Sequence, residues 1–219
     1  MVQQNVASIL RGKKAAVFDF DGVIVQSNGI KDQAFHDIFS EHPDHFQEMW
    51  DYHKSSNATP RQEKFIHVLT NIIKDPDATQ KAAQWTERFA ETTQQQVIAC
   101  DYVAGILDFL VYLRDHGIMT MVASATPDPQ LNAIIAGRDL ADHFHEVWGA
   151  NLKKPEIFKN IFARHGLKPE EVLFFGDSDE DLASARKVGV DFIGIIGNSS
   201  FPGEGVPTYG DFRGIVTEL

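Results

Sequence analysis

Long hydrophobic runs and cysteines are scarce in this chain of 219 residues. No stretch of about 18 apolar residues occurs, which argues against a transmembrane helix. The polar N-terminus, residues 1–14, does not have the pattern of a signal peptide. The single cysteine, Cys100, excludes a disulfide within the chain and a metal site made only of cysteines. Together these features predict a cytoplasmic protein in a reducing setting.

Positive charge is also in short supply, since 20 Lys and Arg stand against 31 Asp and Glu and the formal net charge is −11. A nucleic-acid binder would show the opposite balance, so neither nucleic acid nor membrane is expected as a partner. An acidic protein that handles an anionic substrate needs a bound cation or a few convergent basic side chains. The apolar fraction of 43% is enough for a sizeable core.

Strands and helices are predicted to alternate over most of the chain. Short apolar runs predict strands, and apolar residues at helical spacing predict the helices that separate them. The predicted strands are 14–20, 118–123, 171–176 and 191–196. The predicted helices of this part are 105–115, 128–137, 155–165 and 180–188. Such alternation is typical of βαβ units, so we expect an α/β fold with a doubly wound parallel sheet.

A helical segment is predicted to interrupt this α/β pattern. Residues 30–100 show helical spacing, first over 30–41, and no convincing strand. One apolar stripe of this segment consists of Phe65, Val68, Leu69, Ile72 and Ile73, and a second contains Trp85 and Phe89. We therefore expect a catalytic core of residues 1–29 and 101–219 and an inserted helical domain of residues 30–100. The Gly- and Pro-rich stretch 197–210 is expected to be a loop.

Polar side chains gather where the predicted strands end. Ligands of open parallel sheets bind beyond the carboxyl ends of the strands, so these side chains are candidates for one site. They are Asp19 and Asp21 after the first strand, Ser124 after the second, Asp177 and Asp181 after the strand 171–176, and Lys154 at the start of a helix.

The spacing of the carboxylates suggests a reaction. Clustered carboxylates raise one another's pKa unless a cation lies among them, and Mg²⁺ with its oxygen ligands suits such a cluster. Asp19 and Asp21 are two residues apart, so one can serve as a nucleophile and the other as an acid, which divides hydrolysis into two steps. Gly22 is expected to bend the backbone sharply and to direct N–H groups at phosphoryl oxygens.

Four motifs together resemble a known family. The run Val17-Phe18-Asp19-Phe20-Asp21-Gly22-Val23-Ile24 resembles the first motif of the haloacid dehalogenase superfamily. Ser124 resembles the second motif, Lys154 the third, and the run 176–181 the fourth. The order and spacing agree over most of the chain, and the closest likeness is to members of the phosphoglycolate phosphatase and beta-phosphoglucomutase-like group. The resemblance implies a Rossmann-like core with a helical cap inserted after the first motif.

The resemblance also implies roles for individual residues. Asp19 would be the nucleophile, forming an aspartyl-phosphate, and a metal ligand. Asp21 would be the general acid for the leaving group and the base for the attacking water, and its backbone carbonyl would ligate the metal. Lys154 would neutralise charge on the nucleophile and the phosphoryl group.

Further roles concern phosphate and metal. Ser124 and the N–H of Ala125 would hold the phosphoryl oxygens, as would Lys154. Asp177 would bind Mg²⁺, with Asp181 as a ligand or as support for the ligands. Substrate specificity would come from the cap, where His53, Lys54, Arg61 and Lys64 are the basic candidates.

Several alternatives stay open at this point. Lys153 competes with Lys154 for the role of catalytic lysine, because the third motif is shorter than in many relatives. Gln26 stands where relatives carry an aspartate, which bears on substrate gating. Ser124 and Thr126 could also cap the helix that follows. Arg61 and Lys64, three residues apart on one helix, could form only a solvated face.

The expected function is Mg²⁺-dependent hydrolysis of a small phosphorylated metabolite, a phosphate monoester. A phosphomutase of sugar phosphates could use the same residues, and a catalytically silent binding protein could keep the fold. A dehalogenase is less compatible, because it needs no acid at Asp21. The sequence does not reveal which phosphate ester is the substrate or how many chains assemble.

Overall fold

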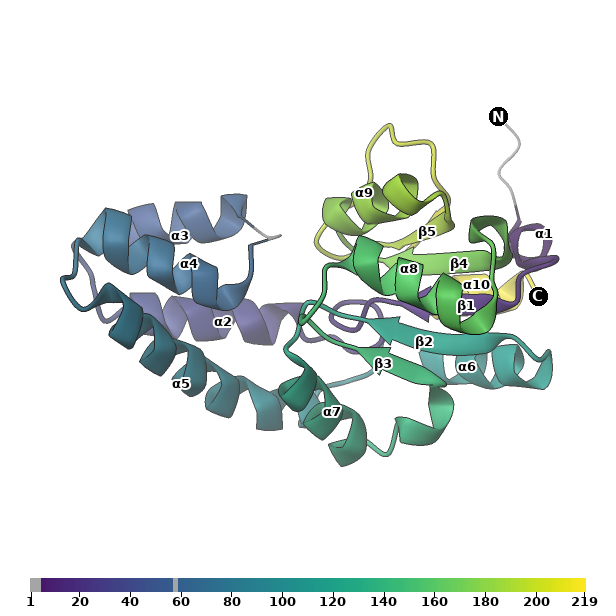
Figure 1. The fold of residues 1–219 in the computed structure, drawn as a ribbon, viewed down its shortest axis with the longest axis horizontal. Coiled ribbons are helices and arrows are strands. Elements are labelled where there is room, and N and C mark those ends of the chain that lie inside the picture. The colour runs from purple at the N-terminus through teal and green to yellow at the C-terminus, as the bar shows by residue number, and fades with distance from the viewer. Residues whose placement is uncertain (1–4, 57–58) are drawn as a thin grey trace. The chain divides into compact units, whose positions relative to one another are not determined.

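The computed structural model describes residues 5–56 and 59–219 (Figure 1). The chain divides into two compact units. The core unit contains Cys100–Leu219 together with the chain up to Asn28, and the insert unit is Gly29–Ala99.

A six-stranded sheet forms the centre of the core unit, with strand order β3-β2-β1-β4-β5-β6. Each neighbouring pair of strands is parallel. The strands are β1 (Ala15–Phe18), β2 (Met119–Ala123), β3 (Glu146–Trp148), β4 (Val172–Gly176), β5 (Asp191–Ile195) and β6 (Thr208–Tyr209). All residues of β1 and β4 are buried, which is why both read as continuous apolar runs in the sequence.

Helices cover both faces of this sheet (Figure 1). The helices of the core unit are α1 (Val6–Leu10), α6 (Ile106–Asp115), α7 (Asp128–Gly137), α8 (Lys154–His165), α9 (Asp179–Val188) and α10 (Phe212–Thr217), with 3₁₀ turns at Ala141–His143 and Pro169–Glu171. Side chains of α8 and α9 pack with Val17 and Phe174 in one hydrophobic cluster. On the other face, Phe109 of α6 and Phe212 of α10 contact Phe18. The predicted doubly wound α/β fold is therefore confirmed.

Two strands differ from the prediction. Strand β3 was not predicted, because it has only three residues, all half-buried, in place of an apolar run. Strand β6 lies within the stretch 197–210, where only a loop was expected, and its two residues pair with Gly194 and Ile195. Both are edge strands of the sheet, and edge strands bury too little surface to require an apolar pattern.

The insert unit is built from helices. They are α2 (Asn28–Phe39), whose first residue belongs to the core unit, α3 (Phe46–Ser55), α4 (Arg61–His67), a π-helical segment (Val68–Ile73) and α5 (Ala78–Ala99). The predicted apolar stripes meet in one hydrophobic cluster that includes Phe35, Phe65, Leu69, Trp85 and Phe89. Burial of such side chains contributes roughly 1.5–3 kcal/mol each, which is the main stabilising term of a small helical unit.

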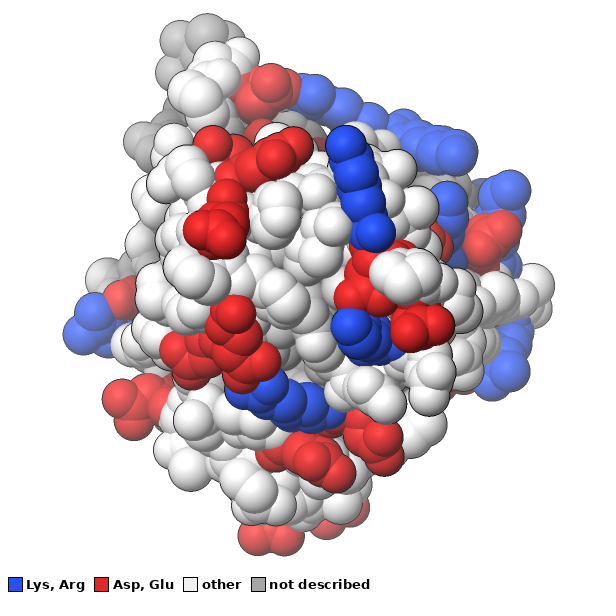
Figure 2. Space-filling view, turned by 90° about the vertical axis from the view of Figure 1, so that its left-hand side faces the viewer, with Lys and Arg blue, Asp and Glu red and all other residues white. Residues whose placement is uncertain are grey.

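The surface and the helix lengths bear on possible partners. Among the described residues, no helix is both long and apolar enough to cross a membrane. Figure 2 shows one face of the molecule, on which acidic and basic side chains are interspersed. Mixed charge of this kind is typical of a solvated surface.

Candidate active site

The carboxyl ends of β1 and β4 are where the candidate site begins. β1 lies between β2 and β4, so the chain order along the sheet reverses at this pair, which is where open α/β sheets bind ligands. Asp19 directly follows β1, and its N–H donates to the carbonyl of Phe175 over 2.9 Å. Asp177 directly follows β4. Both carboxylates are buried, with Asp19 8% and Asp177 1% exposed.

A third carboxylate, Asp181, joins them from the first turn of α9. One ligand oxygen each from Asp19, Asp177 and Asp181 can be chosen so that all three lie within 4.8 Å of one another. Asp181 is fixed by a capping box, in which its Oδ2 accepts from the N–H of Ser178 and its own N–H donates to Ser178 Oγ, each over 3.2 Å. Gly176 is required beside it, because a Cβ there would overlap the Asp181 side chain. The fold thus brings together three acids from two strand ends and one helix.

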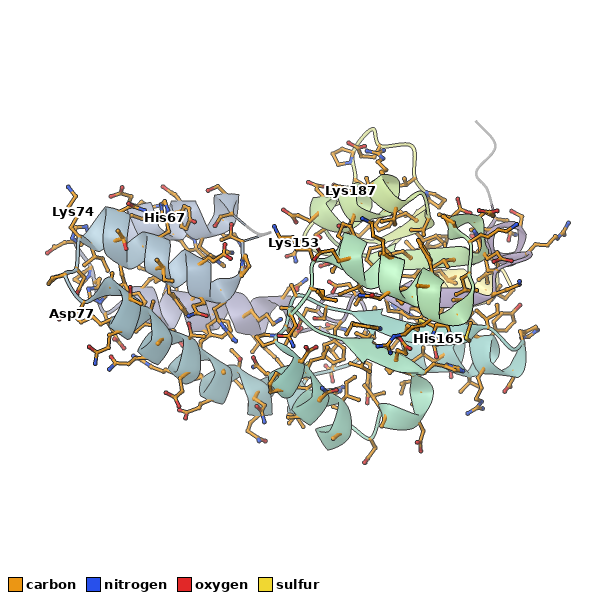
Figure 3. All side chains as sticks on the ribbon, viewed as in Figure 1. His67, Lys74, Asp77, Lys153, His165 and Lys187 are labelled. Carbon is orange, nitrogen blue, oxygen red and sulfur yellow. The ribbon has the colours of Figure 1, made fainter. Side chains whose placement is uncertain are left out.

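Lys154 supplies the positive charge at this cluster. It is the first residue of α8, and its Nζ lies 3.0 Å from Asp19 Oδ1 and also contacts Asp181 Oδ1. Burial tends to lower the pKa of the Lys154 ammonium, but Asp181 and Asp19 outweigh it and hold that pKa above its usual range. Lys153 precedes the helix as an exposed side chain, at the start of α8 in Figure 3. The geometry therefore favours Lys154 over Lys153.

One lysine does not neutralise three buried acids. Burial raises the pKa of Asp19 from 3.8 to about 8, although Lys154 opposes the shift, and the neighbouring carboxylates raise it further. Burial and Asp181 raise the pKa of Asp177 to about 6, against hydrogen bonds from Asn28 and the backbone N–H of Asn198. Without another cation, Asp19 would therefore be largely protonated at neutral pH, and protonated carboxyl groups are poor nucleophiles.

The donor set fits a hard divalent cation. Carboxylate oxygens are the ligands that Mg²⁺ prefers, and it accepts one or two of them together with substrate phosphate and water. Asp19, Asp177 and Asp181 supply such oxygens in a buried cluster. Asp21 contributes no carboxylate to this cluster of three, and the ligand expected from it is its backbone carbonyl.

The Asp21 carboxylate is held by two hydroxyl groups. Ser27 Oγ donates to Asp21 Oδ1 over 2.5 Å, and Thr126 Oγ1 donates to Oδ2 over 2.9 Å. All three side chains are buried, with Ser27 0% and Thr126 4% exposed. Two donors fix the orientation of the carboxylate. A fixed orientation is required of any group that donates a proton to a substrate and later accepts one.

Gly22 makes the expected sharp turn of the backbone after Asp21. Its own N–H donates to the carbonyl of Val25 over 2.8 Å, so this N–H does not point at a phosphoryl group. Its φ of 77° lies in the left-handed region, and a Cβ would overlap Asp177 and Asn28. The sharp bend was predicted correctly, and the expectation that N–H groups of this turn face phosphoryl oxygens stays a prediction for the N–H groups other than that of Gly22.

The second predicted strand ends in Ser124 and Ala125. Ser124 is 1% exposed, and its Oγ accepts from the N–H of Thr126 over 3.0 Å. Ala125 is exposed at the end of the strand. Pro127, and neither Ser124 nor Thr126, occupies the N-cap position of α7.

Three site residues were missed by the sequence reasoning: Ser27, Asn28 and Thr126. Asn28 Nδ2 donates to Asp177 Oδ2 over 2.7 Å, across 149 residues of chain. Ser27 and Asn28 follow Gln26, the position singled out as unusual, but Gln26 is exposed and its amide donates to the Tyr102 carbonyl over 3.2 Å. The pair of small polar residues where the chain leaves the core was the available signal.

Within the insert unit, three of the four basic candidates lie in one network. His53 Nε2 is 3.0 Å from Asp32 Oδ1, and Lys54 Nζ is 2.7 Å from Asp32 Oδ2. Lys64 Nζ is 3.3 Å from His53 Nδ1 and 5.3 Å from the centre of the Phe35 ring. Lys64 is only 4% exposed, so the alternative of a solvated face is wrong for this residue.

The charges in this network can be assigned. A hydrogen bond from His53 holds the pKa of the Asp32 carboxyl down at about 2, with help from Lys54. Burial lowers the pKa of His53, although Asp32 raises it. A neutral His53 accepts from Lys64 at Nδ1 and donates to Asp32 from Nε2, as assigned from the hydrogen-bond pattern. Arg61, the fourth candidate, packs with its guanidinium carbon 4.6 Å from the centre of the Phe89 ring.

The amino-acid sequence of this chain matches a known protein family. Residues 16–195 match the family described as "Haloacid dehalogenase-like hydrolase". The chain is 26% identical over 192 residues to Protein CbbY of Rhodobacter capsulatus, covering 81% of this chain and 82% of that protein. It is 21% identical over 185 residues to a phosphorylated carbohydrates phosphatase of Thermotoga maritima, covering 82% of this chain and 83% of that protein.

A solved structure shows the same fold. The crystal structure of CbbY from Rhodobacter sphaeroides in complex with xylulose-(1,5)bisphosphate superposes with a TM-score of 0.70 at 19% identity. The match covers 91% of this chain and 95% of that one. At this identity the likeness concerns the fold alone.

Proposed function

The chain belongs to the haloacid dehalogenase-like hydrolases, and on this premise we propose that it is a phosphatase that hydrolyses a small organic phosphate monoester through an aspartyl-phosphate on Asp19. The observation that carries the proposal is the contact of Lys154 with Asp19 beside two further buried acids. Burial of a carboxylate carries a large desolvation cost, and buried acids with strongly raised pKa values are typical of functional sites. Nucleophilic attack on phosphorus is the role that fits Asp19.

In the first step, an Asp19 carboxylate oxygen attacks phosphorus and the bond from phosphorus to the ester oxygen breaks. Asp21 gives its proton to the departing oxygen, so an alcohol leaves and the phosphoryl group stays on Asp19. Hydrogen bonds from Ser27 and Thr126 hold the Asp21 carboxyl group in one orientation for this transfer.

In the second step, Asp21 takes a proton from a water molecule that attacks the phosphorus of the aspartyl-phosphate. The bond between phosphorus and the Asp19 oxygen breaks, which frees the carboxylate and inorganic phosphate. Lys154 balances negative charge on the phosphoryl oxygens in both steps, and Ser124 and the N–H of Ala125 bind the same oxygens.

Asp19, the Asp21 carbonyl, Asp177 and Asp181 would hold a Mg²⁺ ion at this site. When bound, the ion supplies positive charge that keeps Asp19 ionised and draws in the phosphate. The raised pKa values of Asp19 and Asp177 support this assignment, because a cation restores the ionised form of both.

The relatives support the substrate class. One is named a phosphorylated carbohydrates phosphatase, and the structure of another was solved with a sugar bisphosphate. We propose a small phosphorylated metabolite as the substrate, with residues 1–29 and 101–219 as the catalytic core and residues 30–100 as the cap. His53, Lys54, Arg61 and Lys64 are the cap residues proposed to select the substrate.

The test is release of inorganic phosphate from a panel of sugar phosphates and phosphorylated carboxylic acids, with Mg²⁺ and then with excess chelator. Mg²⁺-dependent release from a few related compounds is expected. Conversion of a sugar phosphate to its isomer without free phosphate would show a phosphomutase and contradict the proposal.

Two variants make the assay specific. Asp19→Asn keeps the size of the side chain but removes the nucleophile, so turnover should be abolished. Asp179→Asn is the matched control, because Asp179 is an exposed acid on the same helix as Asp181. Equal loss of activity in both variants would point to a nonspecific charge effect.

A further inference from the structure

Two consecutive residues, at the point where the chain leaves the core, hold two different carboxylates of the site. Ser27 donates to Asp21, and Asn28 donates to Asp177. Asn28 is also the first residue of α2, the helix that leads into the insert unit. Asp21 follows β1 and Asp177 follows β4. Residues 27 and 28 therefore hold carboxylates from two strand ends at the point where the chain enters the insert unit.

One carboxylate oxygen of Asp177 accepts two hydrogen bonds. Its Oδ2 accepts from Asn28 Nδ2 over 2.7 Å and from the N–H of Asn198 over 3.2 Å. Glycines stand on both sides of this oxygen: a Cβ at Gly197 would approach it to 2.6 Å, and a Cβ at Gly22 would overlap it together with Asn28 Nδ2. The space around Oδ2 is therefore shaped for a fixed carboxylate with two donors.

We propose that Asn28 is a positioning residue for the metal site: its amide holds Asp177 Oδ2 so that Oδ1 remains directed at the cation shared with Asp19 and Asp181. The inference rests on the metal site of the proposed function. It also assigns a reason to Gly22, whose missing side chain leaves room for the pair of Asn28 and Asp177.

An amide suits this place for two physical reasons. It is a donor without charge, so Asp177 keeps its full negative charge for the cation, whereas a lysine would compete with the metal. Mg²⁺ tolerates little deviation from octahedral geometry, so a carboxylate free to rotate would bind it less well. Groups that orient metal ligands typically account for about a 10- to 100-fold difference in metal affinity.

The experiment measures Mg²⁺ binding directly by isothermal titration calorimetry, without substrate. The variants are Asn28→Ala, which removes the donor, and Asn28→Leu, which keeps the volume but not the amide. Gln26→Ala is the matched control, because it removes an exposed amide two residues away that bonds only a backbone carbonyl among its described contacts. Both Asn28 variants should weaken Mg²⁺ binding at least about tenfold, with Gln26→Ala unchanged.

Thermal unfolding with and without Mg²⁺ separates positioning from a purely structural role. At a given concentration Mg²⁺ stabilises the folded state more the more tightly it binds, so the rise in melting temperature on adding Mg²⁺ should shrink in both Asn28 variants. Variants that bind Mg²⁺ as tightly as the wild type, yet melt earlier with and without it, would overturn the inference.

The failure of this inference can be told from failure of the proposed function. Wild-type protein that binds no Mg²⁺ and releases no phosphate would contradict both. Wild-type protein that binds Mg²⁺ and releases phosphate, with Asn28 variants of equal Mg²⁺ affinity, would contradict the role of Asn28 alone.

Discussion

Without a divalent cation, the folded protein should lose stability as the pH rises from about 7 to about 8. The cause is Asp19, because burial in the folded state raises the pKa of its carboxyl group from 3.8 to about 8. In this interval the unfolded chain has already released the proton, whereas the folded chain still holds it in part. Each increment of pH therefore favours the unfolded state.

The size of the effect follows from the pKa. For a folded-state pKa of about 8, linkage predicts a loss of about 1 kcal/mol between pH 7 and 8. For a chain of this size that corresponds to a fall in melting temperature of roughly 2–4 °C. The interval avoids most of the opposite contribution from His53, whose folded-state pKa is lowered by burial. That lowered pKa makes stability rise with pH, mainly below about pH 7, where an unfolded histidine still releases its proton.

Scanning calorimetry in excess chelator at the two pH values is the appropriate assay, since it resolves separate transitions if the two units unfold independently. Asp19→Asn is the control: it cannot titrate, so its melting temperature should change less than that of the wild type. Saturating Mg²⁺ should remove the difference, because the cation stabilises the ionised carboxylate. An equal fall in the variant and the wild type would refute the role of Asp19 in this linkage.

Three further predictions concern single side chains. Lys154→Met should lower kcat/KM about 100-fold or more, because it removes the ammonium from Asp19, whereas Lys153→Met should have little effect; equal losses in a steady-state phosphate assay would contradict the assignment. Ser27→Ala should lower kcat about 10- to 100-fold by loosening Asp21, with folding unchanged by circular dichroism; wild-type kcat would exclude that role. Gly22→Ala should lower the melting temperature in chelator, because φ is 77° and the new Cβ overlaps Asp177; an unchanged melting curve would contradict the strain argument.

The main elements of the core could be predicted because buried parallel strands leave a clear mark in the sequence. Ala15–Phe18 and Val172–Gly176 are buried at every position, so both appear as apolar runs. Glu146–Trp148 is half-buried throughout, and three residues carry no usable period. The edge strands therefore could not be predicted from the sequence and are identified only in the structure.

The candidate site could be predicted in outline for the same reason. Carboxyl ends of parallel strands meet at one edge, so Asp19 and Asp177 had to lie close together. Asn28 could not be found this way, since its partner is 149 residues distant and an asparagine at the start of a helix is equally typical of a turn. The burial of Lys64 was also beyond sequence reasoning, because a lysine on an amphipathic helix is usually solvated.

The central claim is that the phosphoryl group passes through Asp19. It is tested most directly by mixing Asp21→Asn with Mg²⁺ and an activated phosphate ester, quenching in acid, and locating the phosphoryl group by peptide mass spectrometry. The account predicts phosphate on Asp19, accumulating because the variant lacks the base that activates water. Turnover by this variant with no phosphate on Asp19, or with phosphate on another residue, would contradict it.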